Sequence, residues 1–369
     1  MTIAALAVAT SCGKSDTPTA ASGPVDVRLV VSSGNNTRVG SDAKDNDIRQ
    51  LRVYAFKGDK KVGYAEADSL RGQNYIPITL SEDGEINFYV IANDNFGPKP
   101  KVGTTPVTDW TSLSKANLES LKFDLSGFGG WSATNDFVSP MSNNRYDEFG
   151  NELKNDSGTA AYKNDYGTAV NVTKPTTGTL VIPVTVQHVL GRLRLMLNKE
   201  SDDVTITLKR AAVYNRPDYF LLYNSGSADI EYNNNKSLVD NNKSLVDEFV
   251  NRDIPLETTQ KEVARTYLAP NLYGSGDPDT YTAQKTDGTT SSNGLNEAYR
   301  LELTVEFAYT TGTSETKNYT EDYTVYLPRV PRNTSIDVQG TFKGTVVKPE
   351  FNVMTEAWEE KEMNIPAFQ

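Results

Sequence analysis

Apolar residues recur at every second position in several short segments of this chain, which is the period of a half-buried β-strand. In the first such segment, 25–33, Val25, Val27, Leu29 and Val31 share one face, so we expect an edge strand that fills an apolar groove. A Gly-Asn-Asn-Thr stretch follows, exposed small and polar sequence that a protease can thread through its active site. A cut after Arg38 would detach the strand. The ordinary alternative is a permanent first strand of a sandwich.

The same alternation continues along the chain and predicts an all-β fold. The stretch 180–197 is the longest apolar one, and we interpret it as two consecutive strands bent at Gly191. One short helix is expected at 113–121, capped by Ser112 or Ser114. Other strands are expected at 48–56, 75–80, 86–93, 204–210, 211–214, 219–223, 299–309, 319–328 and 335–342.

The end of the chain carries apolar residues within a charged tail. Across 346–368 the apolar anchors include Val353, Trp358, Met363, Ile365 and Phe368. An extended peptide of this kind can add to an open sheet edge, where main-chain hydrogen bonds give affinity and pockets accept alternate side chains. We expect a donor strand here, with closure of the chain's own second sandwich as the alternative.

The N-terminal segment is typical of a bacterial lipoprotein precursor. Cys12, the only cysteine, follows the apolar run 3–9 and two small polar residues. In such signals lipid is attached to the thiol and the chain is cut just before the cysteine. The run is shorter than the roughly 20 residues that span a bilayer. A Gly-, Ser-, Thr- and Pro-containing tether, 13–24, follows, while a buried free cysteine is the alternative.

Composition narrows the function. A net charge of −11 argues against nucleic acid as a partner, because a phosphate backbone requires clustered Lys and Arg. With one histidine, His188, and one cysteine, most His- or Cys-based catalysis is excluded, so we expect neither an enzyme nor a metal or cofactor. The 19 tyrosines, with Trp110 and Trp131, leave open a surface module that stacks sugars on aromatic rings.

Several short motifs follow one another along the chain. They are Ile48-Arg-Gln-Leu-Arg-Val-Tyr-Ala-Phe56, Ile86-Asn-Phe-Tyr-Val-Ile-Ala-Asn93, Ser139-Pro-Met141, Ala212-Val-Tyr-Asn-Arg-Pro217, Tyr267-Leu-Ala-Pro-Asn271, Pro331-Arg-Asn-Thr-Ser-Ile-Asp-Val-Gln-Gly340, Trp358 and Asn364-Ile-Pro-Ala-Phe368. In this order they resemble the fimbrillins, the pilus subunits of Bacteroidetes. The resemblance covers residues 12–368, and its specificity comes from the order of the motifs and from the lipoprotein start.

The resemblance implies a type V pilus subunit, of the shaft or the tip, built from two transthyretin-like β-sandwich domains in tandem, with long loops and one or two short helices. It implies a palmitoylated outer-membrane precursor with lipid on Cys12, and an Arg-specific surface protease that cuts between Arg38 and Val39. The C-terminal strand of a neighbouring subunit, in a homo- or hetero-polymer, would then replace the lost strand. The expected regions are 1–24 (signal and tether), 25–38 (removable strand and cleavage loop), 39–190 (first domain) and 191–369 (second domain, with donor strand 346–368). Anchor subunits of the family are not cut.

Overall fold

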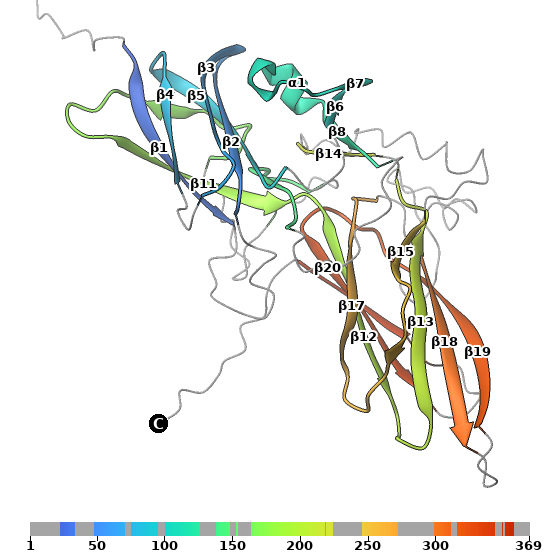
Figure 1. The fold of residues 1–369 in the computed structure, drawn as a ribbon. Helices are drawn as coiled ribbons and strands as arrows, with labels where there is room; N and C mark the ends of the chain where they lie inside the picture. Colours follow the sequence, from blue (N-terminus) through green and yellow to red (C-terminus); the bar gives the residue numbers. More distant parts are fainter. Residues whose placement is uncertain are drawn as a thin grey trace, which may run out of the picture.

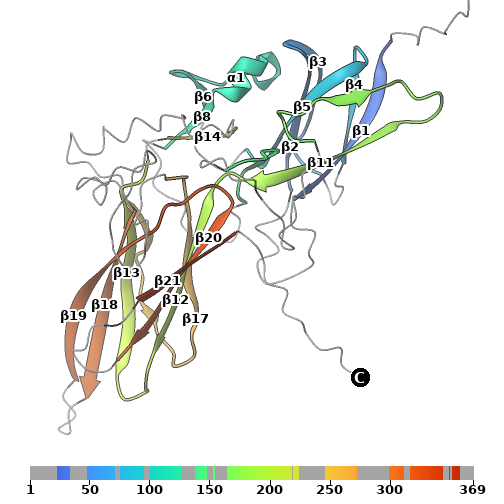
Figure 2. The same ribbon diagram turned by 180° about the vertical axis from the view of Figure 1, so that it is seen from behind.

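The computed structural model of the chain describes residues 23–33, 48–70, 75–94, 100–125, 138–147, 153, 164–217, 219–223, 246–271, 299–310, 316–343, 349 and 351–357. Strands dominate these ranges, which confirms the all-β prediction (Figures 1 and 2). Within them, no helix has the length and apolar character needed to cross a membrane.

The N-terminal half forms one eight-stranded sheet in the order β3-β2-β5-β9-β11-β1-β4, with β10 paired to β5. Its two end strands approach each other: Ser81 N, directly after β4, donates a 2.8 Å hydrogen bond to Val62 O in β3. The sheet therefore curls almost to closure. Its strands are β1 Val25–Ser33, β2 Leu51–Lys57, β3 Lys60–Ala67, β4 Tyr75–Leu80, β5 Gly84–Ala92, β9 Met141–Ser142, β10 Val170–Val172 and β11 Leu180–His188.

The C-terminal half contains two sheets that enclose one apolar core (Figure 1). One sheet has the order β17-β12-β20-β21, and the other has the order β15-β13-β18-β19 with β16 added to β13. The strands are β12 Gly191–Lys199, β13 Thr205–Tyr214, β15 Asp247–Val250, β16 Ile254–Pro255, β17 Lys261–Leu268, β18 Arg300–Thr310, β19 Thr316–Tyr326, β20 Thr334–Phe342 and β21 Phe351–Ala357.

The two halves repeat one pairing pattern. β1 lies between antiparallel β4 and parallel β11, and β12 lies between antiparallel β17 and parallel β20. β12 is therefore the counterpart of β1. The two differ in connectivity, because only Val189 and Leu190 separate the end of β11 from the start of β12.

A fourth sheet, made of short strands, joins the halves. β14 Tyr219–Leu221 comes after residue 191 in the chain, yet it pairs with β8 Leu121–Asp124, so this sheet contains strands from both sides of the boundary expected at 190. β6 Pro100–Val102 and β7 Thr105–Pro106 complete this sheet. An apolar cluster beneath it includes Phe123, Val189, Phe220 and Tyr267, residues from both halves.

Buried polar contacts fix this junction. The carbonyl oxygen of Leu222 accepts hydrogen bonds from Ser142 Oγ at 2.9 Å, Asn144 Nδ2 at 3.0 Å and Arg332 Nη1 at 3.0 Å. Arg216 forms a 2.8 Å ion pair with Asp247, and both side chains are 2% exposed. Unpaired buried polar groups are costly, so these contacts hold the joining segments in one arrangement.

Two local predictions need correction. The helix is shorter than expected: α1 covers Lys115–Glu119 after the 3₁₀ turn η1 Trp110–Ser112, and it is preceded by a capping box in which Ser114 and Asn117 bond reciprocally. The expected strands 204–210 and 211–214 are one strand, β13. A register shift between Leu208 and Arg210 breaks the alternation that suggested a boundary.

Candidate functional site

β1 has a hydrogen-bonded neighbour on both sides, so it is not the edge strand that the sequence suggested (Figure 1). It runs parallel to β11 and antiparallel to β4, and Leu29 lies opposite Ile182 on one side and Ile76 on the other. The sequence could not show this, because β11 lies about 150 residues away along the chain. We call the space between β4 and β11, which β1 fills, the β1 groove.

The inward face of β1 is part of the core. Val25, Val27, Leu29 and Val31 are 0–1% exposed and belong to the apolar cluster of the N-terminal half. Burial of such side chains contributes about 1.5–3 kcal/mol each, so the four together contribute roughly 6–12 kcal/mol as an upper estimate. This is comparable with the whole stability of a typical domain, about 5–15 kcal/mol. β1 therefore holds the N-terminal half together.

The β11 wall offers β1 a full set of backbone groups, although it contains Pro183. Pro183 O accepts a 2.7 Å hydrogen bond from Asn164 Nδ2, and the carbonyl of Asn164 accepts one from Asn143, next to β9. β9 pairs with β11 on the side away from β1. Since the N and the C=O of one strand residue point to the same side, the missing N–H of Pro183 does not face the groove.

The β4 wall is arranged in the same way. Ser81 N points to β3, and strand alternation places the nitrogen of Pro77, four residues earlier, on that same outer side. The N–H groups of Ile76, Ile78 and Leu80 therefore face β1. Proline is tolerated in strands where its nitrogen faces away from the ladder, so both prolines weaken the outer edges of the walls and leave the groove intact.

β4 depends on β1 for its place in the sheet. In the strand order β4 follows β1 and has no further ladder partner among the described strands. Besides β1, it meets β3, where Gly63 permits close approach: a Cβ there would lie 2.8 Å from Leu80 Cδ2. If β1 left, β4 would lose its ladder and β11 would gain an open edge.

The candidate donor strand is only partly within the described residues. Val353 lies in β21, opposite Val338 of β20, and is half-buried against the core of the C-terminal half. β21 is the last strand in its sheet order, so it closes that sandwich from one edge. Trp358, Met363, Ile365 and Phe368 lie outside the described residues, as do Cys12, Arg38, Val39 and Trp131.

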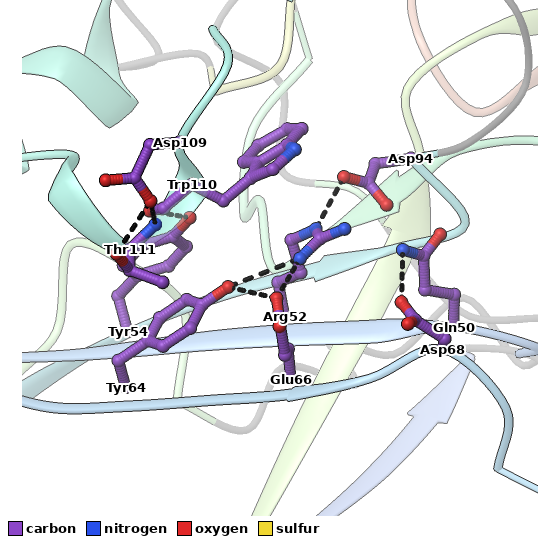
Figure 3. Close-up of polar contacts among 10 residues, drawn as sticks. All are labelled: Gln50, Arg52, Tyr54, Tyr64, Glu66, Asp68, Asp94, Asp109, Trp110 and Thr111. Atoms are coloured by element: carbon purple, nitrogen blue, oxygen red, sulfur yellow. Dashed lines mark hydrogen bonds and ion pairs between the residues drawn. The ribbon is translucent and has the colours of Figure 1, made fainter.

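Trp110 lies in a polar network that connects the 3₁₀ turn to β2 and β3 (Figure 3). The Arg52 guanidinium lies 4.8 Å from the Trp110 ring centroid and donates to Asp94 at 2.7 Å, to Tyr64 at 3.2 Å and to Glu66. Burial raises the pKa of Asp94 against the opposing effect of Arg52, and burial raises the pKa of Tyr64 to about 12.

The hydrogen bonds of this network join its residues to one another. Tyr54 donates a 2.9 Å hydrogen bond to the carbonyl of Trp110, which fastens the turn to β2 (Figure 3). One face of the indole is already covered by Arg52, so the arrangement favours a structural role for Trp110 over a sugar-stacking platform. No group of three or more His, Cys, Asp or Glu within the described ranges is placed to hold a metal ion.

His188 lies in β11 and is 2% exposed. Burial, together with the charge of Arg192, lowers its pKa to about 3, so the imidazole is neutral at physiological pH. His188 is therefore a buried residue of a central strand. Because the imidazole is buried, this environment does not provide a general base for a reaction in solvent.

No protein-family model matches the sequence, and no curated protein matches it. Solved structures do match. A candidate cell adhesion protein from Bacteroides eggerthii DSM 20697 aligns with a TM-score of 0.51 at 12% identity, over 91% of this chain and 96% of that chain. This chain has the same fold. The likeness confirms, at the level of the fold, what the fimbrillin resemblance implied.

Two fimbrial proteins from Porphyromonas gingivalis also match over most of their length. The tip fimbrial protein Mfa3, with a C-terminal truncation, has a TM-score of 0.47 at 13% identity, covering 91% of this chain and 100% of that chain. The fimbrilin FimA from strain W83 has a TM-score of 0.46 at 11% identity, covering 90% and 96%.

The alternation of apolar residues in 25–31 predicted the inward face of β1 but not the strands on either side of it. Pro77 and Pro183 were the available signal, since each interrupts a period-two apolar strand at an outward position. A proline at such a position indicates a strand with one protected edge, and two such strands suggest the walls of a single groove.

Proposed function

We propose that this chain is a non-enzymatic subunit of a cell-surface pilus of the fimbrillin kind, and that β1 is a removable strand. The position of β1 is the observation that supports this most. An N-terminal strand inside a sheet, rather than at its edge, leaves two facing edges when it departs. Its buried side chains leave an apolar groove of matching length.

The physical consequence is a subunit that needs a partner. Loss of β1 removes roughly 6–12 kcal/mol of apolar burial, which is of the order of a domain's stability. A strand from a neighbouring subunit would restore both the ladder and the burial. The proposed donor is the C-terminal segment containing Val353, Trp358, Met363, Ile365 and Phe368, in a homo- or hetero-polymer that supports adhesion.

Processing follows the same proposal. The precursor carries lipid on Cys12 at the outer membrane, and an Arg-specific surface protease cuts between Arg38 and Val39. Arg28 resists this protease, because it lies in a strand paired on both sides, whereas a protease needs an extended, unpaired segment. The mature subunit requires no metal or cofactor.

Limited proteolysis with an Arg-specific protease tests the proposal, with the Arg38→Ala chain as matched control. We expect one early cut, after Arg38, in the parent chain and none there in the control. Native mass spectrometry should then show assemblies only in the cut sample. An uncut Arg38, or a cut chain that stays monomeric at every concentration, contradicts the removable strand and favours an uncleaved anchor.

The N-terminus of the mature surface protein provides a second measurement. Edman sequencing or mass spectrometry should find Val39 in assembled subunits and a lipid-modified Cys12 in the precursor. A mature, assembled protein that begins at Cys12 would show that β1 is permanent.

A further inference from the structure

The outward face of β1 makes two specific contacts with β4. Thr79 Oγ1 donates a 2.7 Å hydrogen bond to Asp26 Oδ1. Two residues further along β1, the Arg28 guanidinium lies 4.5 Å from the centroid of the Tyr75 ring. All four residues lie on the solvent side of the sheet, so these contacts come in addition to the apolar contacts inside the β1 groove.

The opposite wall differs in chemistry. Val181 of β11 lies in register with Arg28 and is 55% exposed, which is unusual for a large aliphatic side chain among the described residues. The outer rim of the groove therefore has a hydroxyl and an aromatic ring on the β4 side and an aliphatic surface on the β11 side. A long cationic side chain suits this setting, since its stem can cover apolar surface while its charge meets a ring.

We propose that Thr79, Tyr75 and Val181 determine which strands the β1 groove accepts. The preferred occupant is an extended strand of another protein chain with apolar residues facing inward, an acceptor such as Asp, Glu or Asn opposite Thr79, and Lys or Arg two residues later. This inference rests on the proposed function, because it describes the strand that would replace β1.

The pattern discriminates among candidate donors, including this chain's own tail. In β21, with Phe351 and Val353 facing the core, the alternate residues are Asn352 and Met354, an acceptor followed by a residue without charge. In the stretch 357–369 around Met363 and Ile365, no Lys or Arg stands two residues after an Asp, Glu or Asn with an apolar residue between the two. The rim therefore favours a donor from a different subunit over a copy of this chain.

The expected effects follow from the two contacts. Loss of an exposed cation–π contact weakens binding about 3-fold, and loss of a hydrogen bond to a charged acceptor weakens it about 10-fold. Together they predict a difference of about 30-fold between a strand with the full pattern and one with alanine at both outward positions.

An exchange experiment on the full chain tests the inference. A specific protease site, placed in the segment after β1, allows a cut that does not depend on Arg38. Exchange of the retained N-terminal fragment for labelled peptides of sequence 23–33 is then followed by native mass spectrometry. Peptides with Asp26→Ala, Arg28→Ala or both are compared with the parent peptide and with a peptide of the chain's own tail, 349–369.

Matched substitutions in the groove assign the effects. We expect Arg28→Ala in the peptide to weaken its binding to the parent chain and to have no effect on its binding to a Tyr75→Leu chain. Likewise, Asp26→Ala in the peptide should weaken its binding to the parent chain and have no effect on its binding to a Thr79→Val chain. Equal binding of all β1 peptides, or effects that persist in these chains, overturns the rim inference alone. If no strand peptide exchanges, the removable strand itself is refuted, and the rim inference with it.

Discussion

Leu29→Ala tests whether β1 holds the N-terminal half together. Leu29 is fully buried and lies between Ile76 and Ile182 in neighbouring strands. Truncation of a buried leucine to alanine costs about 2–5 kcal/mol, because transfer free energy is lost and a cavity remains. We take about 3 kcal/mol for this site.

The same free energy appears in two assays. In the intact chain, urea denaturation is monitored by hydrogen exchange of the backbone amides of β4 and β11. The free energy of unfolding should fall by about 3 kcal/mol at constant m-value. In the cut chain, where β1 is held without a covalent link, it should appear as release of the N-terminal fragment about 100-fold faster, since about 1.4 kcal/mol corresponds to a factor of ten.

Val246→Ala is the matched control. Val246 lies outside the β1 groove, next to β15, and its side chain is exposed, so we expect a change within about 0.5 kcal/mol. A Leu29→Ala chain that loses less than about 1 kcal/mol, or that leaves exchange in β4 unaltered, would refute the argument that the inward face of β1 carries the stability of this half.

Three further predictions concern the frame around the groove. Asp247→Asn replaces the buried carboxylate beside Arg216 by a neutral group of the same shape, and calorimetry across a range of pH should measure its effect. Since burial raises the pKa of Asp247 from 3.8 to about 6, this carboxyl favours the folded state most below about pH 4, and that contribution is lost as pH rises through 6; the Asn chain should lack this dependence. Asn143→Ala should cost about 2–4 kcal/mol in urea titrations, because its side chain bonds backbone groups of β5. Gly191→Ala should cost about 1–3 kcal/mol, since its Cβ would lie 2.5 Å from Val330 Cγ1, and Val330→Ala should restore part of the loss.

Local pattern was sufficient for β1 and for the bend at Gly191. The alternation of four apolar residues in 25–31 fixed which face is buried, and a glycine between two apolar runs marked the end of one strand and the start of the next. β3 and β17 were missed because their sequences, Lys-Lys-Val-Gly-Tyr-Ala-Glu-Ala and Lys-Glu-Val-Ala-Arg-Thr-Tyr-Leu, mix charged and apolar residues without a clean period of two. Both lie at the ends of their sheets, where one flank is free of a ladder partner.

The groove itself could not be predicted from local pattern. Its walls come from β4 and β11, and only the register brings Tyr75 and Val181 to the positions beside Arg28 and Val30. Thr79 and Tyr75 are ordinary outward residues of a strand until that register is known. Long-range pairing is set by the total burial of the fold, so no window of the sequence contains it.

The repeated topology explains why only one of the two equivalent positions suits a removable strand. β12 has the same kind of neighbours as β1, but it continues from β11 through Val189 and Leu190, which are fully buried in the junction cluster. A protease would have to open that core to free β12. β1 is joined covalently to the rest of the sheet by the single segment 34–47, and its other contacts with the sheet are non-covalent. One cut in that segment therefore removes the covalent link between β1 and the rest of the fold. β12, in contrast, stays covalently joined to β11, which is a wall of the β1 groove. Through this link, a strand bound in the groove is connected to the core of the C-terminal half.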